Sequence, residues 1–87
     1  MTYRVTWKRV ALRRLAAICL AAPNRRLVSK ASDVAERQLM ADPVSAGKPF
    51  KRGYRRYHVT PLTVEYTIDV GRGEVTIVNV LPGDRTT

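Results

Sequence analysis

The stretch from Leu62 to Val70 alternates apolar and polar residues over nine positions, and this alternation constrains the fold more than any other feature of the chain. A period of two is typical of a β-strand with one buried and one exposed face. Turn signals bound the stretch, with Thr60-Pro61 before it and Gly71-Arg72-Gly73 after it. The predicted inward residues are Leu62, Val64, Tyr66, Ile68 and Val70, and the predicted outward residues are Thr63, Glu65, Thr67 and Asp69.

A further strand is predicted on each side of this alternation. The leading strand, within residues 51–59, is basic and contains interleaved aromatic residues. The following strand, residues 75–81, is apolar nearly throughout, which is typical of a central strand covered on both sides. Residues 51–81 are therefore predicted to form a three-stranded antiparallel meander.

Two amphipathic helices are predicted before the meander, over residues 8–22 and 25–41, after a short strand at residues 3–7. Asn24 is a candidate N-cap for the second helix, and Asp42-Pro43 is expected to end it. Apolar residues recur at helical spacing on one side of each helix. These predicted buried faces are Leu12, Leu15, Ala16 and Cys19 in the first helix, and Leu27, Val28, Ala31, Val34, Ala35 and Leu39 in the second.

Together these elements predict an α+β fold in a single domain, residues 1–87. A short N-terminal strand is followed by an antiparallel helix hairpin, which is expected to cover the apolar face of the meander. Residues 44–50, which contain Gly47 and Pro49, are predicted to form a loop between the hairpin and the meander.

The formal net charge of +9 and the pI near 10.6 imply a polyanionic partner, either nucleic acid or an acidic protein. Residues 48–58 contain five Lys or Arg and no acid. A basic run with interleaved aromatics is typical of phosphate contact with base stacking. The alternative is a solvated edge strand that its charges protect from aggregation. The predicted nucleic-acid contacts are Lys48, Lys51, Arg52, Tyr54 and Arg55.

Several classes of function find no support in the sequence. Cys19 is the only cysteine, so an intramolecular disulfide and a cysteine zinc site are excluded. Its place in an apolar stripe predicts a small buried residue. The chain has no glycine-rich phosphate loop, no Ser-His-Asp arrangement and no cluster of metal ligands, so we expect neither a metal nor a cofactor.

Residues 1–22 loosely imitate a signal peptide, because basic residues precede an apolar run of eight. Tyr3, Val5 and Trp7 alternate with polar residues as a strand does, and the apolar run is too short to span a bilayer. We therefore expect a cytoplasmic protein without a membrane partner.

Arg56 and His58 are the candidates for chemistry. They share one face of the leading strand, about 6–7 Å apart, if Tyr57 and Val59 face the helices. Metal-independent RNA cleavage needs a base for the 2′-hydroxyl, a cation for the developing phosphorane charge and an acid for the leaving oxygen. His58 can serve as base or acid, and Arg56 can serve as the cation. A purely structural role for the single histidine is the alternative.

Over essentially its whole length the chain resembles the RelE/ParE superfamily of toxins from type II toxin–antitoxin systems. The resemblance rests on patterns in five segments rather than on one motif. These are Tyr3-Arg4-Val5-Thr6-Trp7, Asp42-Pro43 with Gly47, Tyr57-His58-Val59, Leu62 to Ile68, and Val75 to Val80.

This resemblance implies a β-α-α-β-β-β fold and a cognate antitoxin protein as partner. It also implies roles for Arg56 and His58, which match positions where the ribosome-dependent nucleases of the family carry basic residues. Those nucleases carry an arginine early on the next strand, where this chain has Thr63. Many carry a further basic residue after the last strand, and only Arg85 can match it. The implied catalytic set is Arg56, His58 and Arg85.

The resemblance leaves the target open between two branches. Growth inhibition by ribosome-dependent mRNA cleavage, as a metal-independent endoribonuclease, is the leading hypothesis. Inhibition of DNA gyrase without RNA cleavage, as in the ParE branch, is the alternative. A non-catalytic RNA- or DNA-binding module, and a protein whose charge serves only an acidic partner, are hypotheses from other classes.

Overall fold

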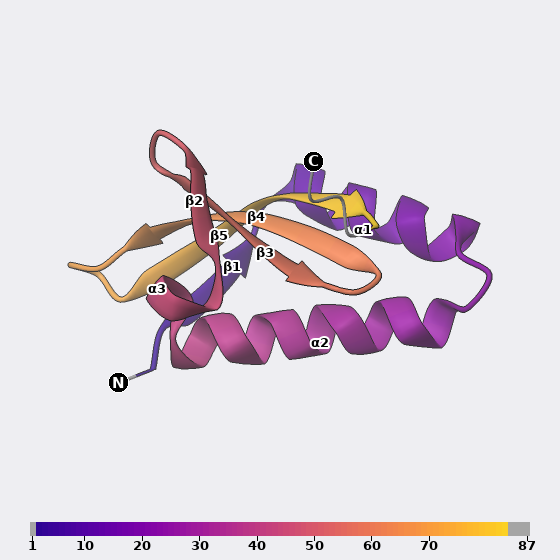
Figure 1. Ribbon diagram of the computed structural model, residues 1–87, viewed down its shortest axis with the longest axis horizontal. Coiled ribbons are helices and arrows are strands. Elements are labelled where there is room, and N and C mark those ends of the chain that lie inside the picture. The colour runs from indigo at the N-terminus through magenta and orange to yellow at the C-terminus, as the bar shows by residue number, and fades with distance from the viewer. Residues whose placement is uncertain (1, 84–87) are drawn as a thin grey trace.

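The computed structural model describes residues 2–83, which form one five-stranded sheet and three helices (Figure 1). The strand order is β1-β5-β4-β3-β2. β1 pairs with β5 in parallel, and the other neighbours are antiparallel. The predicted α+β order of strand, helix hairpin and meander is confirmed. The elements are β1 (Arg4–Trp7), α1 (Arg9–Ala21), α2 (Arg25–Ala41), α3 (Pro43–Ala46), β2 (Lys48–Lys51), β3 (Tyr54–Val59), β4 (Leu62–Asp69) and β5 (Glu74–Pro82).

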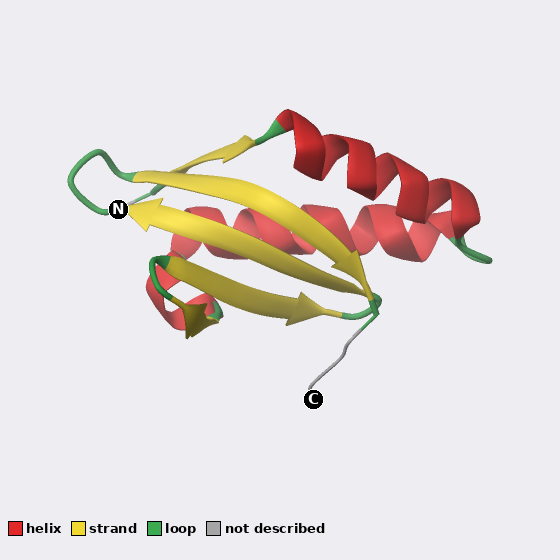
Figure 2. Cartoon of the chain, turned by 90° about the horizontal axis from the view of Figure 1, so that it is seen from above, coloured by secondary structure: helices red, strands yellow, loops and turns green. Residues whose placement is uncertain are grey.

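The hydrophobic core lies between the sheet and the two long helices, which cover one face of the sheet (Figure 2). α1 packs mainly on β5, whereas α2 packs on β1, β3 and β4. Trp7 Nε1 donates a 2.7 Å hydrogen bond to Glu36 Oε1 and ties β1 to α2. The buried apolar residues are Ala11, Val28, Ala31, Ala35, Leu39, Leu62, Val64, Tyr66, Val75, Ile77 and Val80.

α1 buries a stripe that differs from the predicted one. Ala11 is fully buried and Leu15 and Ile18 pack against the core, whereas Leu12 is 48% exposed. Cys19, predicted to be a small buried residue, packs against the core but is only partly buried. The stripe that begins at Ala11 has the same helical spacing as the predicted one, so periodicity alone does not choose between them. Docking on β5 makes that choice.

α2 begins and ends where the sequence indicates. The Asn24 side chain accepts hydrogen bonds from the backbone N–H groups of Arg26 and Leu27, which confirms the N-cap. Of the predicted inward residues, Val28, Ala31, Ala35 and Leu39 are buried, whereas Leu27 is 54% exposed. The predicted burial of Leu27 was therefore wrong.

The predicted loop at residues 44–50 was also wrong, because this segment contains most of α3 and the start of β2. Asp42 caps α3 by accepting a hydrogen bond from the Ser45 N–H, and Pro43 occupies the first helical turn. β2 pairs with β3, where Gly47 permits a close approach. A Cβ at Gly47 would lie about 2.6 Å from the Tyr66 hydroxyl and closer still to the Arg56 carbonyl oxygen. Four-residue elements give no usable periodicity, so the sequence alone did not indicate them.

A β-bulge between β4 and β5 changes which residues of β5 face the core. Glu65 pairs with Asn79, but the next residue, Tyr66, pairs with Ile77, so Val78 is the extra residue. Ile77 and Val80 are consequently both buried. β5 lies between β1 and β4, as predicted for a central strand. The predicted burial of Val70 was wrong, because β4 ends at Asp69 and Val70 is 66% exposed in the turn.

Candidate nucleic-acid interface

The face of the sheet opposite the helices carries the residues expected to act chemically. On β3, Tyr57 and Val59 pack against the core. Successive side chains of a strand point to opposite faces, so Arg56 and His58 point to the open face. The predicted parity of β3 is thus confirmed, and it places both candidates on one surface.

Arg56 is held in place by two neighbours, Glu65 and Phe50, and Asn79 in turn holds Glu65. Nε of Arg56 donates a 2.9 Å hydrogen bond to Glu65 Oε2 on β4, and Glu65 Oε1 accepts a 3.1 Å hydrogen bond from Asn79 Nδ2 on β5. The guanidinium carbon lies 4.1 Å from the centre of the Phe50 ring. Within residues 2–83 the hydrogen bond to Glu65 is made by Nε, which leaves the two Nη groups of Arg56 as donors for a phosphate.

His58 is oriented by a chain of two hydrogen bonds. The Thr63 hydroxyl donates its only proton to the Gly83 carbonyl oxygen at 2.8 Å. It must therefore accept at its 2.9 Å contact with His58 Nδ1, and Nδ1 must carry a proton. The neutral imidazole then has its unprotonated nitrogen at Nε2. With Nδ1 bonded to Thr63, Nε2 is the ring nitrogen that general acid–base chemistry would use.

The sequence did not identify four residues that contact Arg56, His58 or their partners, namely Glu65, Thr63, Asn79 and Phe50. Alternation along β4 correctly placed Thr63 and Glu65 on the outward face, and this was the available signal. Their partners follow only from the register, in which Arg56 faces Glu65 and His58 faces Thr63. Although both point outward, Thr63 is only 4% and Glu65 only 8% exposed. The open face thus contains a nearly buried acid beside its central arginine.

The predicted binding residues on β2 and the β2–β3 turn form a basic aromatic cluster. Phe50 and Tyr54 have ring centres 6.3 Å apart, and Lys51 Nζ lies 4.8 Å from the Tyr54 ring centre. Lys48 and Arg52 are exposed on the same hairpin. Since Arg56 stacks on Phe50, this cluster is continuous with the Arg56 site. Cations held on aromatic faces are suited to contacting phosphates beside a stacked base.

Arg55 differs from its basic neighbours, because its side chain lies on the same face of β3 as Tyr57 and on the opposite face from Arg56. Its Nη2 group donates to the carbonyl oxygens of Val44 and Gly47, at 2.6 Å and 2.8 Å. Nε of Arg55 is buried and has no hydrogen-bond partner among residues 2–83. The structure thus places this predicted nucleic-acid contact on the other side of β3, where it fastens α3 and the start of β2.

Tyr66 forms the support beneath this hairpin. It is fully buried, and its hydroxyl donates a 2.6 Å hydrogen bond to the Pro43 carbonyl oxygen. Burial raises the pKa of the Tyr66 phenol, and the neighbouring Arg55 guanidinium offsets part of that rise. Tyr66 and Arg55 together hold α3 against the sheet, at the point where the chain enters the basic hairpin.

Arg85, the third residue of the predicted catalytic set, lies outside the described residues. Within residues 2–83, no three His, Cys, Asp or Glu side chains are grouped so that they could hold a metal ion.

Comparison with solved structures places this arrangement among known folds. The RelBE2 toxin–antitoxin complex of Mycobacterium tuberculosis matches with a TM-score of 0.79 and 24% identity, over 94% of this chain and 92% of that one. The chain has the RelE/ParE toxin fold. The ParDE system of Pseudomonas aeruginosa matches with a TM-score of 0.71 and 20% identity, over 95% of this chain and 98% of that one. The Escherichia coli RelE toxin matches with a TM-score of 0.67 and 11% identity, over 97% and 87%.

At these identities the likeness concerns the RelE/ParE toxin fold rather than a shared target. No protein-family model and no curated protein sequence matches the chain. Among residues 2–83 of this RelE/ParE-fold chain, no helix is long and apolar enough to cross a membrane.

Proposed function

We propose that this protein is the toxin of a type II toxin–antitoxin pair and that it cleaves mRNA on the ribosome. The observation that carries the proposal is the placement of Arg56 and His58 on one open face, with the proton of His58 fixed at Nδ1 by Thr63. The RelE/ParE fold and the net charge of +9 support it. The ribosome as target puts the protein in the cytoplasm, with a cognate antitoxin as partner.

The proposed reaction is attack of a ribose 2′-oxygen on the adjacent phosphorus. The new O–P bond forms while the bond to the 5′-oxygen breaks, which leaves a 2′,3′-cyclic phosphate and a 5′-hydroxyl. His58 Nε2 takes the 2′-hydroxyl proton or delivers a proton to the leaving oxygen. The Nη groups of Arg56 stabilise the charge that develops on the phosphorane oxygens. Arg85 stays a predicted second cation.

Gyrase inhibition is a second candidate function, and one observation favours it. The Glu65 carboxylate lies 2.9 Å from Arg56 Nε and offsets part of the charge that a nuclease would direct at phosphate. A protein that binds its target without chemistry needs only the basic surface. The same argument applies to a non-catalytic nucleic-acid-binding module.

Inducible expression in bacteria tests these candidates, with growth, RNA integrity and DNA supercoiling followed in one culture. On the nuclease proposal His58→Gln lowers cleavage by about two decades or more, and Arg56→Ala does the same. Thermal unfolding of His58→Gln should match that of the wild type. Arg56→Ala leaves the nearly buried Glu65 carboxylate without its cation and should lower stability, so its cleavage is compared at a temperature where the variant stays folded. On the gyrase candidate His58→Gln is nearly silent, so full toxicity of this variant at matched expression contradicts the catalytic role.

A further inference from the structure

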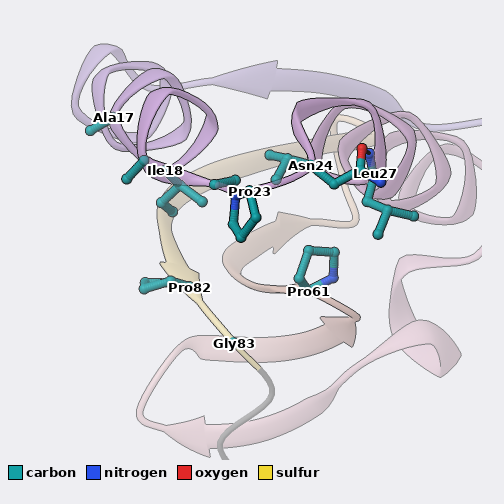
Figure 3. Close-up of a pocket in the computed structure, with 11 residues that line it drawn as sticks. Ala17, Ile18, Pro23, Asn24, Leu27, Pro61, Pro82 and Gly83 are labelled. Atoms are coloured by element: carbon teal, nitrogen blue, oxygen red, sulfur yellow. Dashed lines mark hydrogen bonds between the residues drawn. The ribbon is translucent and has the colours of Figure 1, made fainter.

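An apolar groove lies at the end of the molecule where α1 and α2 connect (Figure 3). This end lies away from β2 of the basic hairpin (Figure 1). The volume of the groove is about 660 Å³. The groove is lined by three prolines, Pro23 of the helix connection and Pro61 and Pro82 of the strand ends. Ile18 and Leu27 of the helices also line it. Leu27 is 54% exposed, although it is a large apolar side chain at the edge of the core. The groove therefore presents apolar surface that the described chain leaves uncovered.

The lining chemistry indicates what kind of ligand the groove suits. Among the described lining residues Asn24 is the only one with a polar side chain, and its oxygen already caps α2. Sites for small metabolites usually combine an apolar cavity with a few precisely placed polar groups. This groove has no such group to spare, so it fits apolar side chains projecting from another polypeptide.

Three arginines adjoin the lining residues along the chain. Arg25 and Arg26 directly follow the lining residue Asn24, and Arg14 lies one turn before Ala17 and Ile18 on α1. All three arginines are exposed, and within residues 2–83 none of them makes an ion pair. No acid occurs among residues 1–32. Acidic side chains beside the apolar anchors of a partner would therefore meet complementary charge.

The groove is also connected to the open face through one residue. Gly83 lines the groove, and its N–H donates to the Pro61 carbonyl oxygen, another lining residue. The Gly83 carbonyl oxygen accepts the hydrogen bond from Thr63 that fixes Nδ1 of His58. A side chain pressed against Pro61 and Gly83 therefore bears on the hydrogen bonds that orient His58.

We infer that this groove is the docking site for an acidic amphipathic segment of a partner protein, and that occupancy of the groove is transmitted to His58 through Gly83 and Thr63. The inference rests on the proposed function only in taking the partner to be an antitoxin. The partner would then act at His58 without covering the basic face. Coupling of this kind is a two-site effect that must be measured at both sites.

Binding is tested with purified protein and a synthetic helical peptide of about 18 residues, with Leu at every third or fourth position and Glu between. Two control peptides replace every Glu by Lys, or every Leu by Ala. We expect the Leu–Glu peptide to bind at least about tenfold more tightly than either control. Leu27→Glu should weaken its binding by about tenfold or more. Val10→Glu is the matched control, because Val10 is 56% exposed on α1 and does not line the groove.

The transmitted effect is read from the imidazole NMR signals, which are unique because the chain has one histidine. We expect the Leu–Glu peptide to shift the His58 signals at constant pH. Thr63→Val should keep the peptide affinity and lose the shift, whereas Thr63→Ser, which retains the hydroxyl, should keep both. Binding without a His58 shift, or an equal shift in the Thr63→Val variant, overturns the connection.

The docking site itself is overturned if Leu27→Glu and Val10→Glu bind the peptide equally, or if the Lys peptide binds as well as the Glu peptide. It is also overturned if sedimentation equilibrium shows a dimer of this chain that Leu27→Glu dissociates, because the occupant is then a second copy. The binding assay contains neither ribosome nor gyrase. Peptide binding without growth arrest therefore contradicts the proposed toxin function alone, and growth arrest without peptide binding contradicts the groove alone.

Discussion

Arg56 Nε donates a 2.9 Å hydrogen bond to Glu65 Oε2 across the paired strands β3 and β4. Glu65 is in turn bonded by Asn79, and Arg56 lies against Phe50. The central cation of a basic face is thus positioned by a nearly buried acid. Glu65 therefore has two opposing effects on phosphate binding by Arg56. It orients the guanidinium group, which favours binding, and it offsets part of the positive charge, which weakens binding.

Replacing Glu65 should separate these two effects. Glu65→Gln removes the negative charge, so affinity for single-stranded RNA should rise severalfold at low salt, by roughly 1 kcal/mol. The hydrogen bond to Arg56 loses its charge assistance, so cleavage should fall by about tenfold on the nuclease proposal. Glu74→Gln is the matched control, because Glu74 pairs with Arg4 at 3.5 Å on β1 and β5, outside the Arg56 site. Equal behaviour of the two variants in RNA binding and cleavage assays contradicts the positioning role.

The salt dependence of RNA binding should report how many cations the open face contributes. Four described cations belong to this face and its hairpin, namely Lys48, Lys51, Arg52 and Arg56. If each neutralises one phosphate of a single strand, log K should fall against log salt with a slope of about −2.8. Titrations by fluorescence anisotropy at several salt concentrations measure the slope. A flat dependence would remove the polyanion hypothesis.

Alanine substitution should affect stability at Arg55 and nucleic-acid binding at Arg52. Arg55→Ala removes hydrogen bonds to two carbonyl oxygens and should lower the free energy of unfolding by roughly 2–3 kcal/mol. Arg52→Ala changes an exposed turn residue and should alter stability by less than about 0.5 kcal/mol. The salt slope should become shallower by about 0.7 for Arg52→Ala. Urea denaturation measures the two changes in the free energy of unfolding. A stable Arg55→Ala variant with weakened RNA binding would show that Arg55 contacts RNA and is not structural.

Stability should fall at alkaline pH partly because of Tyr66. Burial raises the pKa of its phenol above the ordinary value, so above pH about 10 the unfolded chain releases this proton while the folded chain keeps it. The unfolded state then binds fewer protons, and the free energy of unfolding falls as pH rises. The contribution is fully present below pH about 10 and is lost as pH rises through the raised folded pKa.

The Tyr66→Phe variant isolates this contribution from the lysines that titrate in the same range. It should be less stable by about 1–3 kcal/mol at neutral pH, because the Pro43 carbonyl oxygen loses its donor. Its unfolding free energy should then decline less steeply than that of the wild type above pH about 10. Parallel pH profiles for the two proteins would show that Tyr66 does not contribute.

Much of this fold could be predicted from local patterns. Alternation predicted β4 and the outward positions of Thr63 and Glu65, and it correctly assigned Arg56 and His58 to one face of β3. Asn24 identified the start of α2 by its side-chain chemistry. These features depend on neighbours within a few residues along the chain, so their physical causes are visible in the sequence.

The errors arose where two segments far apart in the chain meet. The choice between two stripes on α1 depended on its docking against β5, and the exposure of Leu27 depended on the groove that forms between the helix connection and the strand ends. Arg55 belongs to a basic run in sequence, yet its partners are carbonyl oxygens of α3 and the segment after it. Local charge could not reveal those acceptors.

The sequence by itself determined the order of the two long helices and of β1, β3, β4 and β5, the basic face and the residue types available for chemistry, because periodicity and charge are local properties. Only the tertiary structure decided that Glu65 holds Arg56 and that Gly83, through Thr63, fixes the proton of His58. Each of these contacts joins neighbouring strands or strand ends, so it depends on register and on the bulge after Glu65. Register is set when the strands pack together under the helices, and a shift of one residue would move Arg56 and His58 to the covered face.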